Sequence, residues 1–217
     1  MTHATQEMHQ YYAGRAPYYD AVYLKPERQQ DIAWLREHLP QRLAGREVLE
    51  VACGTGYWTQ HIAPVAQHMV ATDANAEPLA FARQRPGVQQ VHFTLADAYA
   101  LGPELGQFDA AFAGLWFSHV PLERQAEFLH GLHQRLKPGA RVLMIDNSTV
   151  QLQDFPIAET DAAGNTYQHR ALRDGSVHRV LKNFPTEAQL RTLLAPMAQG
   201  VQFRALDNFW MVEYELA

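Results

Sequence analysis

A short apolar segment followed by two closely spaced glycines constrains the fold most. Residues 47–51 (EVLEV) have the pattern of a buried strand, Gly54 and Gly56 follow, and residues 55–63 have the pattern of a helix that Pro64 ends. Glycine lacks a Cβ atom, so it accepts backbone angles and close approaches that a side chain would forbid. A strand, a glycine-rich turn and a helix in this order let a ligand lie against the main chain at the carboxyl end of a sheet.

Strand and helix patterns alternate on both sides of this motif. Pro40 and Gly45 are expected to end the first helix, and Asn75 to cap the third. We expect further strands at 67–72, 91–95, 108–114 and 141–146, and helices at 27–39, 75–85 and 122–136. Such alternation is typical of a parallel sheet with helices on both faces.

Residues 148–184 interrupt the alternation. Two stretches, 165–172 and 176–183, flank Asp174 and Gly175, a pair that favours a hairpin turn. We therefore predict a β-hairpin insertion here. Thr186 is expected to cap a helix through Leu194. The strands that close the chain are expected at 201–205 and 210–216.

Two acidic residues follow neighbouring strands of the predicted sheet. Asp73 lies at the end of the strand 67–72, and Asp97 lies just past the strand 91–95. A carboxylate at the first position can accept hydrogen bonds from both hydroxyls of a ribose. One at the second can accept a bond from an adenine amino group. Together with the glycine-rich turn, these residues indicate a nucleoside-containing cofactor.

Residues 46–147 resemble the core of class I, Rossmann-like S-adenosylmethionine-dependent methyltransferases. The resemblance rests on the segments EVACGTG, TDA, ADA, FDAAFAGL and LKPGA. It implies an α/β three-layer αβα sandwich with a mostly parallel, seven-stranded sheet. One C-terminal strand would be antiparallel and lie between the fifth and sixth strands. The expected division of this single 1–217 domain is an N-terminal helical lid (1–40), a cofactor-binding core (46–147), a substrate-side insertion (148–184) and a C-terminal helix with strands (185–217).

The resemblance also implies how these residues would hold S-adenosylmethionine. Asp73, with the adjacent Ala74, would bind the ribose, Asp97 and Ala98 the adenine, and Leu115 would lie beneath the sulfonium. The residues expected around the methionine part are Glu50, Ala52, Gly54 and Gly56. The alternative is a purely structural role, in which Asp73 and Asp97 only cap the segments that follow them.

The N-terminal segment YYAGRAPYYD resembles the lid of small-molecule methyltransferases such as quinone-ring enzymes. By this resemblance Tyr12, Arg15 and Tyr19 cover the cofactor, and Arg15 pairs with its carboxylate. Trp58 is expected to line the same pocket. The alternative is that the tyrosines form a packed amphipathic surface and that Arg15 faces solvent.

The segment after the strand 108–114 carries the candidate acceptor residues. Trp116 and Phe117 could form a wall of the acceptor pocket, and His119 could remove a proton from the acceptor because histidine titrates near neutral pH. Asn147 ends the strand 141–146 and is expected to face the same pocket. The alternatives are core packing for the two aromatic residues, a structural histidine and a turn asparagine. The aromatic content favours a flat acceptor, aromatic or heteroaromatic.

Composition bears on the class of partner. The formal net charge is −5, which disfavours a nucleic-acid partner. With a single cysteine, Cys53, no intramolecular disulfide can form, and no segment has the pattern of a signal peptide or a membrane span. We therefore expect a cytoplasmic protein without a membrane partner. The histidines show no metal-ligand spacing, so no metal is expected.

These patterns predict transfer of a methyl group from S-adenosylmethionine to a small-molecule acceptor. One alternative is a non-catalytic S-adenosylmethionine-binding regulatory protein, because a fold alone does not settle function. The other is an NAD(P)-dependent oxidoreductase. Thr59 stands where the dinucleotide fingerprint has its third glycine, and the chain has no dehydrogenase-like Tyr-x-x-x-Lys pair, which disfavours that class.

Overall fold

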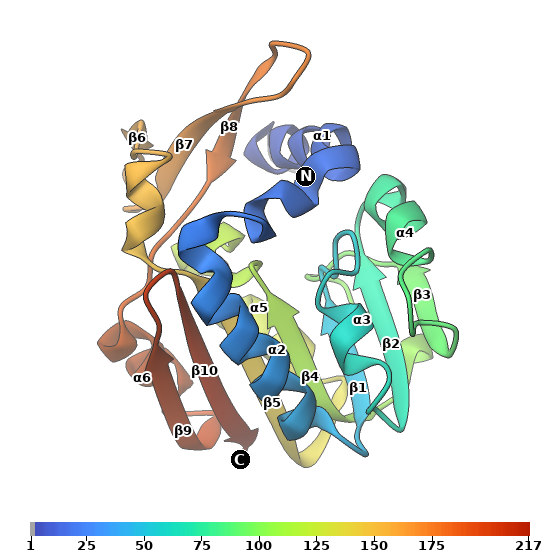
Figure 1. Cartoon of the computed structure of the whole chain (residues 1–217). Coiled ribbons are helices and arrows are strands. Elements are labelled where there is room, and N and C mark those ends of the chain that lie inside the picture. Colours follow the sequence, from blue (N-terminus) through green and yellow to red (C-terminus); the bar gives the residue numbers. More distant parts are fainter. Residues whose placement is uncertain (1–2) are drawn as a thin grey trace.

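Seven strands form one twisted sheet in the computed structural model, which describes residues 3–217. The strands are β1 (Glu47–Val51), β2 (His68–Asp73), β3 (Val91–Leu95), β4 (Phe108–Gly114), β5 (Leu136–Asn147), β9 (Ala198–Ala205) and β10 (Phe209–Leu216). Their order is β3-β2-β1-β4-β5-β10-β9 (Figure 1). β10 pairs antiparallel with β5 and β9, and the other neighbours are parallel. The predicted fold class, including the position of the antiparallel strand, is confirmed.

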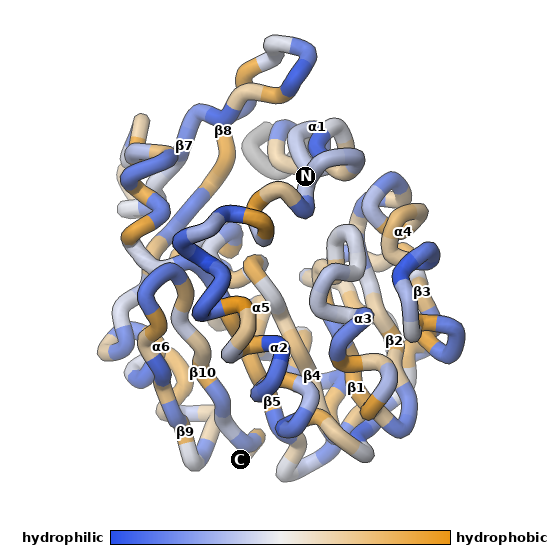
Figure 2. Tube along the Cα trace, in the orientation of Figure 1, coloured by the Kyte–Doolittle hydropathy of each residue, from blue (hydrophilic) through white to orange (hydrophobic). Residues whose placement is uncertain are grey.

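The central strands are apolar because helices cover both of their faces. In β1 the residues Val48, Leu49 and Val51 are fully buried, and Figure 2 shows apolar residues along the central strands. The register places Glu50 beside Ala71 of β2 and Phe112 of β4. Parallel neighbours in this register bring the carboxyl ends of β1, β2 and β4 to one edge of the sheet.

Helices form the two outer layers. One layer holds α2 (Gln29–Leu43), α3 (Thr59–Ile62) and α4 (Ala76–Ala82), and the other holds α5 (Gln125–His133) and α6 (Glu187–Leu194) (Figure 1). Leu35 and Leu39 of α2 belong to one apolar cluster, and Phe128 of α5 and Leu190 of α6 belong to another. Thr186 caps α6 as predicted, since its side chain accepts a bond from the backbone N–H of Gln189.

Four local predictions are wrong, each for a physical reason. Pro40 lies inside α2, which continues to Leu43, because both Leu39 and Leu43 are buried against the sheet and their burial offsets the cost of the proline. α3 begins only at Thr59, because the turn before it is wound through left-handed residues. Asn75 stands at the start of α4 without a side-chain cap, since its Oδ1 faces His9 instead.

The fourth concerns the helix expected over residues 122–136. It is divided into a 3-10 turn, η5 (Leu122–Arg124), and the shorter α5. Leu136 has the spacing of the apolar helix face, but it belongs to the sheet, because it pairs with Phe108 at the start of β5. The register of β4 and β5 shifts between Phe108 and Ala110 to accommodate this.

Two segments far apart in sequence lie beyond the carboxyl ends of the strands. The first is α1 (His3–Arg15) with the 3-10 segment η1 (Ala16–Tyr23), and the second is the hairpin of β7 (Thr166–Ala171) and β8 (Val177–Leu181) (Figure 1). The hairpin is confirmed, and β6 (Glu159–Thr160) adds a third strand to it. Met8 and Tyr11 of α1 pack on Val180 and Leu181 of β8. We call α1 and the β7–β8 hairpin together the roof.

The remaining helical segments are short 3-10 turns: η2 (Pro26–Arg28), η3 (Pro103–Leu105), η4 (Phe117–His119) and η6 (Thr149–Gln153).

Candidate functional site

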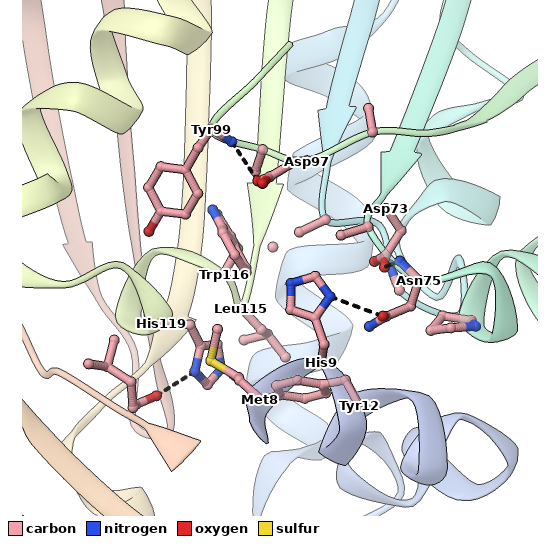
Figure 3. A pocket seen from close by; sticks show the side chains of 18 of the residues that line it. Met8, His9, Tyr12, Asp73, Asn75, Asp97, Tyr99, Leu115, Trp116 and His119 are labelled. Atoms are coloured by element: carbon pink, nitrogen blue, oxygen red, sulfur yellow. Dashed lines mark hydrogen bonds between the residues drawn. The ribbon is translucent and has the colours of Figure 1, made fainter. Parts of the chain in front are cut away.

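A cavity of about 320 Å³ lies between the carboxyl ends of β1 to β4 and the roof (Figure 3). Four loops that the sequence analysis singled out converge on it. They contribute Ala52 and Gly54 after β1, Asp73 and Ala74 after β2, Asp97 and Ala98 after β3, and Leu115 after β4. α1 closes the cavity from the other side with Met8, His9 and Tyr12.

The main chain at the cavity adopts left-handed conformations. Among residues 3–217, the two residues other than glycine with positive φ are Ala52 (φ 52°) and Leu115 (φ 58°), and both line the cavity. Such backbone costs of order 1–3 kcal/mol per residue and persists where the surrounding structure holds it, often at functional sites. Both strained residues therefore mark the same place as the glycine-rich turn.

Gly54 leaves open space beside the main chain. Its φ is 57°, and a Cβ atom built on it would meet no atom within 4 Å. Gly56, with φ 74°, differs, because a Cβ there would lie 2.9 Å from both Cα and Cβ of Ala82 in α4. Gly54 thus frees room for a ligand, whereas Gly56 allows close packing of the turn against α4.

The loop geometry fixes the carboxylate of Asp73. Its Oδ2 accepts a bond from the Gly54 N–H (2.9 Å), and its Oδ1 accepts one from the Asn75 N–H (2.9 Å). Burial raises the pKa of Asp73, while these backbone donors oppose the rise. Each carboxylate oxygen can still accept a further bond, so Asp73 can receive two ligand hydroxyls.

Asp97 and Trp116 lie on the side of the cavity away from Asp73 (Figure 3). Asp97 accepts a bond from the Tyr99 N–H (2.9 Å). The indole Nε1 of Trp116 is buried and has no hydrogen-bond partner among the described residues. A buried donor without a partner is rare. This atom is therefore available to a ligand.

His119 joins the core of the site to the roof. Its Nδ1 lies 2.6 Å from the carbonyl oxygen of Leu181, which can only accept, so Nδ1 carries the proton and donates. Its Nε2 then accepts a bond from the hydroxyl of Tyr12 (2.7 Å). Burial lowers the pKa of His119 to about 3, and the charges of Lys182 and Arg170 add to this effect against that of Asp146. The ring is neutral at pH 7.

Four predicted site residues line neither this cavity nor a smaller one that adjoins it. Gly56 packs against α4, and Phe117 packs against Phe128 in the core instead of forming a pocket wall. Trp58 packs against Tyr23. Glu50 accepts a bond from the Thr59 hydroxyl (2.6 Å), and burial raises its pKa to about 8.

A second, smaller cavity of about 130 Å³ adjoins the first. The two share Tyr12, Tyr19, Leu115 and His119. The predicted residues Arg15 and Asn147 line this second cavity and not the first. Its other charged residues were not predicted from the sequence; they are Lys25, Arg28, Arg170 and Lys182. We call this second cavity the basic chamber.

The missed residues carried little sequence signal. Arg170 ends the polar stretch 168–170 of β7 and Lys182 directly follows β8, and neither position differs in the sequence from a solvent-facing one. Met8 and His9 of the first cavity precede the tyrosine-rich segment and match no motif. In the part of the chain that the structure describes, no cluster of three or more metal-ligating side chains occurs. None of the described helices is both long and apolar enough to cross a membrane.

Comparison with known proteins identifies the family of the chain. Residues 48–139 match the family model described as "Methyltransferase domain". The demethylmenaquinone methyltransferase of Lactiplantibacillus plantarum is 31% identical over 194 residues, which cover 80% of each chain. The ubiquinone biosynthesis O-methyltransferase of Azotobacter vinelandii is 34% identical over 114 residues, 51% of this chain and 47% of that protein. The chain thus spans about half the length of the first curated relatives it matches.

A solved structure is similar over the whole chain. The DhpI–SAH complex has a TM-score of 0.83 and 28% identity, with 100% of this chain and 99% of that chain covered. Fold, cavity and sequence agree, and the chain belongs to the class I S-adenosylmethionine-dependent methyltransferases, whose cofactor is S-adenosylmethionine.

Proposed function

We propose that this chain transfers the methyl group of S-adenosylmethionine to a small-molecule acceptor. The observation that carries the proposal is the single cavity that joins left-handed Ala52, Gly54 and Leu115 with the carboxylates of Asp73 and Asp97. The roof covers part of this cavity with Met8, His9 and Tyr12 of α1 and with Tyr167 and Leu181 of the hairpin. A covered concave site of this kind suits a small acceptor.

The residues present suit the cofactor. The two carboxylates offer acceptors for ribose hydroxyls at Asp73 and for the adenine amino group at Asp97 with Ala98. The unpartnered indole N–H of Trp116 offers a donor. The open space beside Gly54 leaves room for the methionine part along the main chain. On this proposal Leu115, shared by both cavities, lies beneath the sulfonium.

S-adenosylmethionine, when bound, supplies a methyl group on a sulfonium that is itself the leaving group. The chain then has to align the acceptor with that methyl group and to keep water out. The roof adds Met8 and Tyr12 of α1 and Leu181 of β8 to the lining, and these side chains reduce the contact of the cavity with water. Tyr12 and Tyr19 line both cavities, so their rings border the path between cofactor and acceptor.

We propose that His119 holds Tyr12 in place. The alternative from the sequence is that His119 is a general base. Its lowered pKa disfavours that role near neutral pH, because an efficient base has a pKa near the working pH. Its Nδ1 proton is also bound by Leu181, and its Nε2 is occupied by the Tyr12 hydroxyl. An acceptor that arrives ionised requires no base.

The test starts from the purified protein and S-adenosylmethionine labelled in the methyl group. We expect label to pass to a small molecule of a metabolite extract, and mass spectrometry identifies the product. Asp73→Asn should weaken S-adenosylhomocysteine binding at least about tenfold in calorimetry, since a ribose hydroxyl loses a charged acceptor. Cofactor binding without transfer to any acceptor would favour a regulatory protein, and absence of cofactor binding would refute the proposal.

A further inference from the structure

Three guanidinium groups of the basic chamber have no acidic partner. Arg15, Arg28 and Arg170 all line the chamber, and none of them has a carboxylate oxygen within 4 Å among the described residues. Arg28 is 4% exposed and Arg170 is 5% exposed. Burying an unpaired charge is costly, and buried cations are normally paired.

Neutral groups alone hold the Arg170 guanidinium. It donates from Nη2 (2.6 Å) and Nε (3.1 Å) to the amide oxygen of Gln168. It also reaches the hydroxyl of Tyr12 (3.4 Å) and the amide oxygen of Gln151 (3.5 Å). These bonds orient the guanidinium without neutralising its charge.

Arg28 likewise has no carboxylate in contact with it among the described residues. Its guanidinium lies 5.4 Å from the centre of the Phe209 ring, and its Nε is buried without a partner among residues 3–217. Burial lowers the pKa of Arg28, and the charges of Asp154 and Glu27, neither of which lies within 4 Å, oppose this effect only in part. The amide Oδ1 of Asn147, which also lines the chamber, is buried without a partner as well. The chamber thus holds polar atoms that its own residues do not satisfy.

The carboxylates near the chamber are already paired with its two lysines. Nζ of Lys182 lies 2.8 Å from Oδ1 of Asp146. Nζ of Lys25 lies 2.5 Å from Oδ2 of Asp154 and 3.6 Å from Oε1 of Glu27, so the lysines already engage all three of these carboxylates. Burial lowers the pKa of Lys182 to about 8, and Arg170 adds to this against Asp146. Five cations line the chamber and three carboxylates pair with them, which leaves the chamber with an excess of positive charge.

We infer that the basic chamber binds an oxyanion of the acceptor, a carboxylate or a phosphate-like group on a small molecule, next to the transferred methyl group. This inference rests on the proposed methyl transfer. Arg28 and Arg170 supply charge-assisted donors, and guanidinium groups suit the planar or tetrahedral oxygens of such ions. The volume of about 130 Å³ accommodates a small acid. A neutral aromatic ring, the acceptor expected from the sequence, would leave the three guanidinium groups uncompensated.

The chamber's position connects the oxyanion to the reaction. Leu115 and His119 border both cavities, so an anion held by Arg28 and Arg170 lies on the acceptor side of the cofactor. The carboxylate of the cofactor is the competing occupant, because Arg15 was expected to pair with it. Saturating the protein with S-adenosylhomocysteine before adding an anion separates the two.

The binding test uses methylphosphonate and acetate as probes on the protein saturated with S-adenosylhomocysteine. We expect at least one probe to bind, and to bind at least about tenfold more weakly to Arg28→Gln and Arg170→Gln, since each loses a charge-assisted bond. Arg28→Lys, which keeps the charge, should retain part of the affinity. Arg204→Gln removes an exposed arginine outside both cavities and should bind as the unaltered protein does. Comparing the probes distinguishes a tetrahedral from a planar oxyanion.

Two results would overturn the inference. One is that neither probe binds the saturated protein, which leaves the chamber to the cofactor's carboxylate. The other is that Arg28→Gln and Arg204→Gln have equal affinities. Labelled-methyl transfer to small acids and to their neutral amides adds an independent reading. Transfer to the amides at equal KM would refute the oxyanion site while upholding the methyltransferase, whereas failure of S-adenosylhomocysteine to bind would refute the proposed function itself.

Discussion

Replacing Gly54 and Gly56 by alanine should separate ligand binding from folding. Both residues have positive φ, and alanine in that conformation costs about 1–2 kcal/mol. For Gly54→Ala the Cβ atom meets no neighbour, and restriction of the unfolded chain offsets part of the strain, so we expect a loss of about 1 kcal/mol. That corresponds to a Tm lowered by about 2–4 °C in a chain of this size.

Gly56→Ala adds a steric conflict to the same strain. Its Cβ atom would lie 2.9 Å from two atoms of Ala82, one of them backbone, so α4 must move. Overpacking of this kind adds about 1–3 kcal/mol, which brings the expected loss to about 3 kcal/mol and the fall in Tm to about 6–12 °C.

Calorimetry with S-adenosylhomocysteine should give the opposite order. Gly54→Ala places a methyl group in the space assigned to the cofactor, so its affinity should fall at least about tenfold. Gly56→Ala should bind within about threefold of the unaltered protein while it stays folded, because Gly56 does not line the cavity. Unaltered affinity in Gly54→Ala would refute the argument that the cofactor lies against this main chain.

Two further predictions concern His119 and Phe117. Because the folded pKa of His119 lies below its unfolded value of about 6.5, its contribution to stability is complete above pH 6.5 and declines as the pH falls toward about 3. Urea unfolding of His119→Gln between pH 6 and 4 should therefore show a slope smaller by about 1.4 kcal/mol per pH unit, and equal slopes would contradict the lowered pKa. Phe117→Ala should lower the free energy of unfolding by about 3–5 kcal/mol in urea unfolding, because Phe117 is fully buried outside the cavities. Its affinity for the cofactor, measured by calorimetry, should not change. A changed affinity with little loss of stability would show that Phe117 forms part of the pocket wall.

The loops that line the larger cavity were predictable from sequence because they are local. The glycine-rich turn, Asp73 and Asp97 each follow a strand within a few residues, and parallel pairing brings strand ends together. Ala52 and Leu115 show where local reasoning stops. Their left-handed backbone is imposed by pairing with neighbouring segments, as when the N–H of Leu115 bonds to the carbonyl of Ile145 (2.8 Å).

The basic chamber was not predictable because it is assembled from distant segments. Arg28 belongs to η2, Arg170 belongs to β7 and Lys182 directly follows β8, and no spacing in the sequence relates them. Phe117 was assigned to the pocket because it directly follows Trp116 in the sequence. At the start of η4 the two side chains point in different directions, so Trp116 lines the cavity while Phe117 is buried in the core.

The roof has a consequence for how the site is reached. α1 lies outside the seven-stranded sheet, and side-chain contacts such as those of Met8 and Tyr11 with Val180 and Leu181 hold it in the roof. α1 should therefore detach at a much smaller free energy than the seven-stranded sheet needs to unfold. Hydrogen exchange at the α1 amides would then measure the same opening event that controls passage of ligands into the cavity, so entry would be set by the docking strength of one helix.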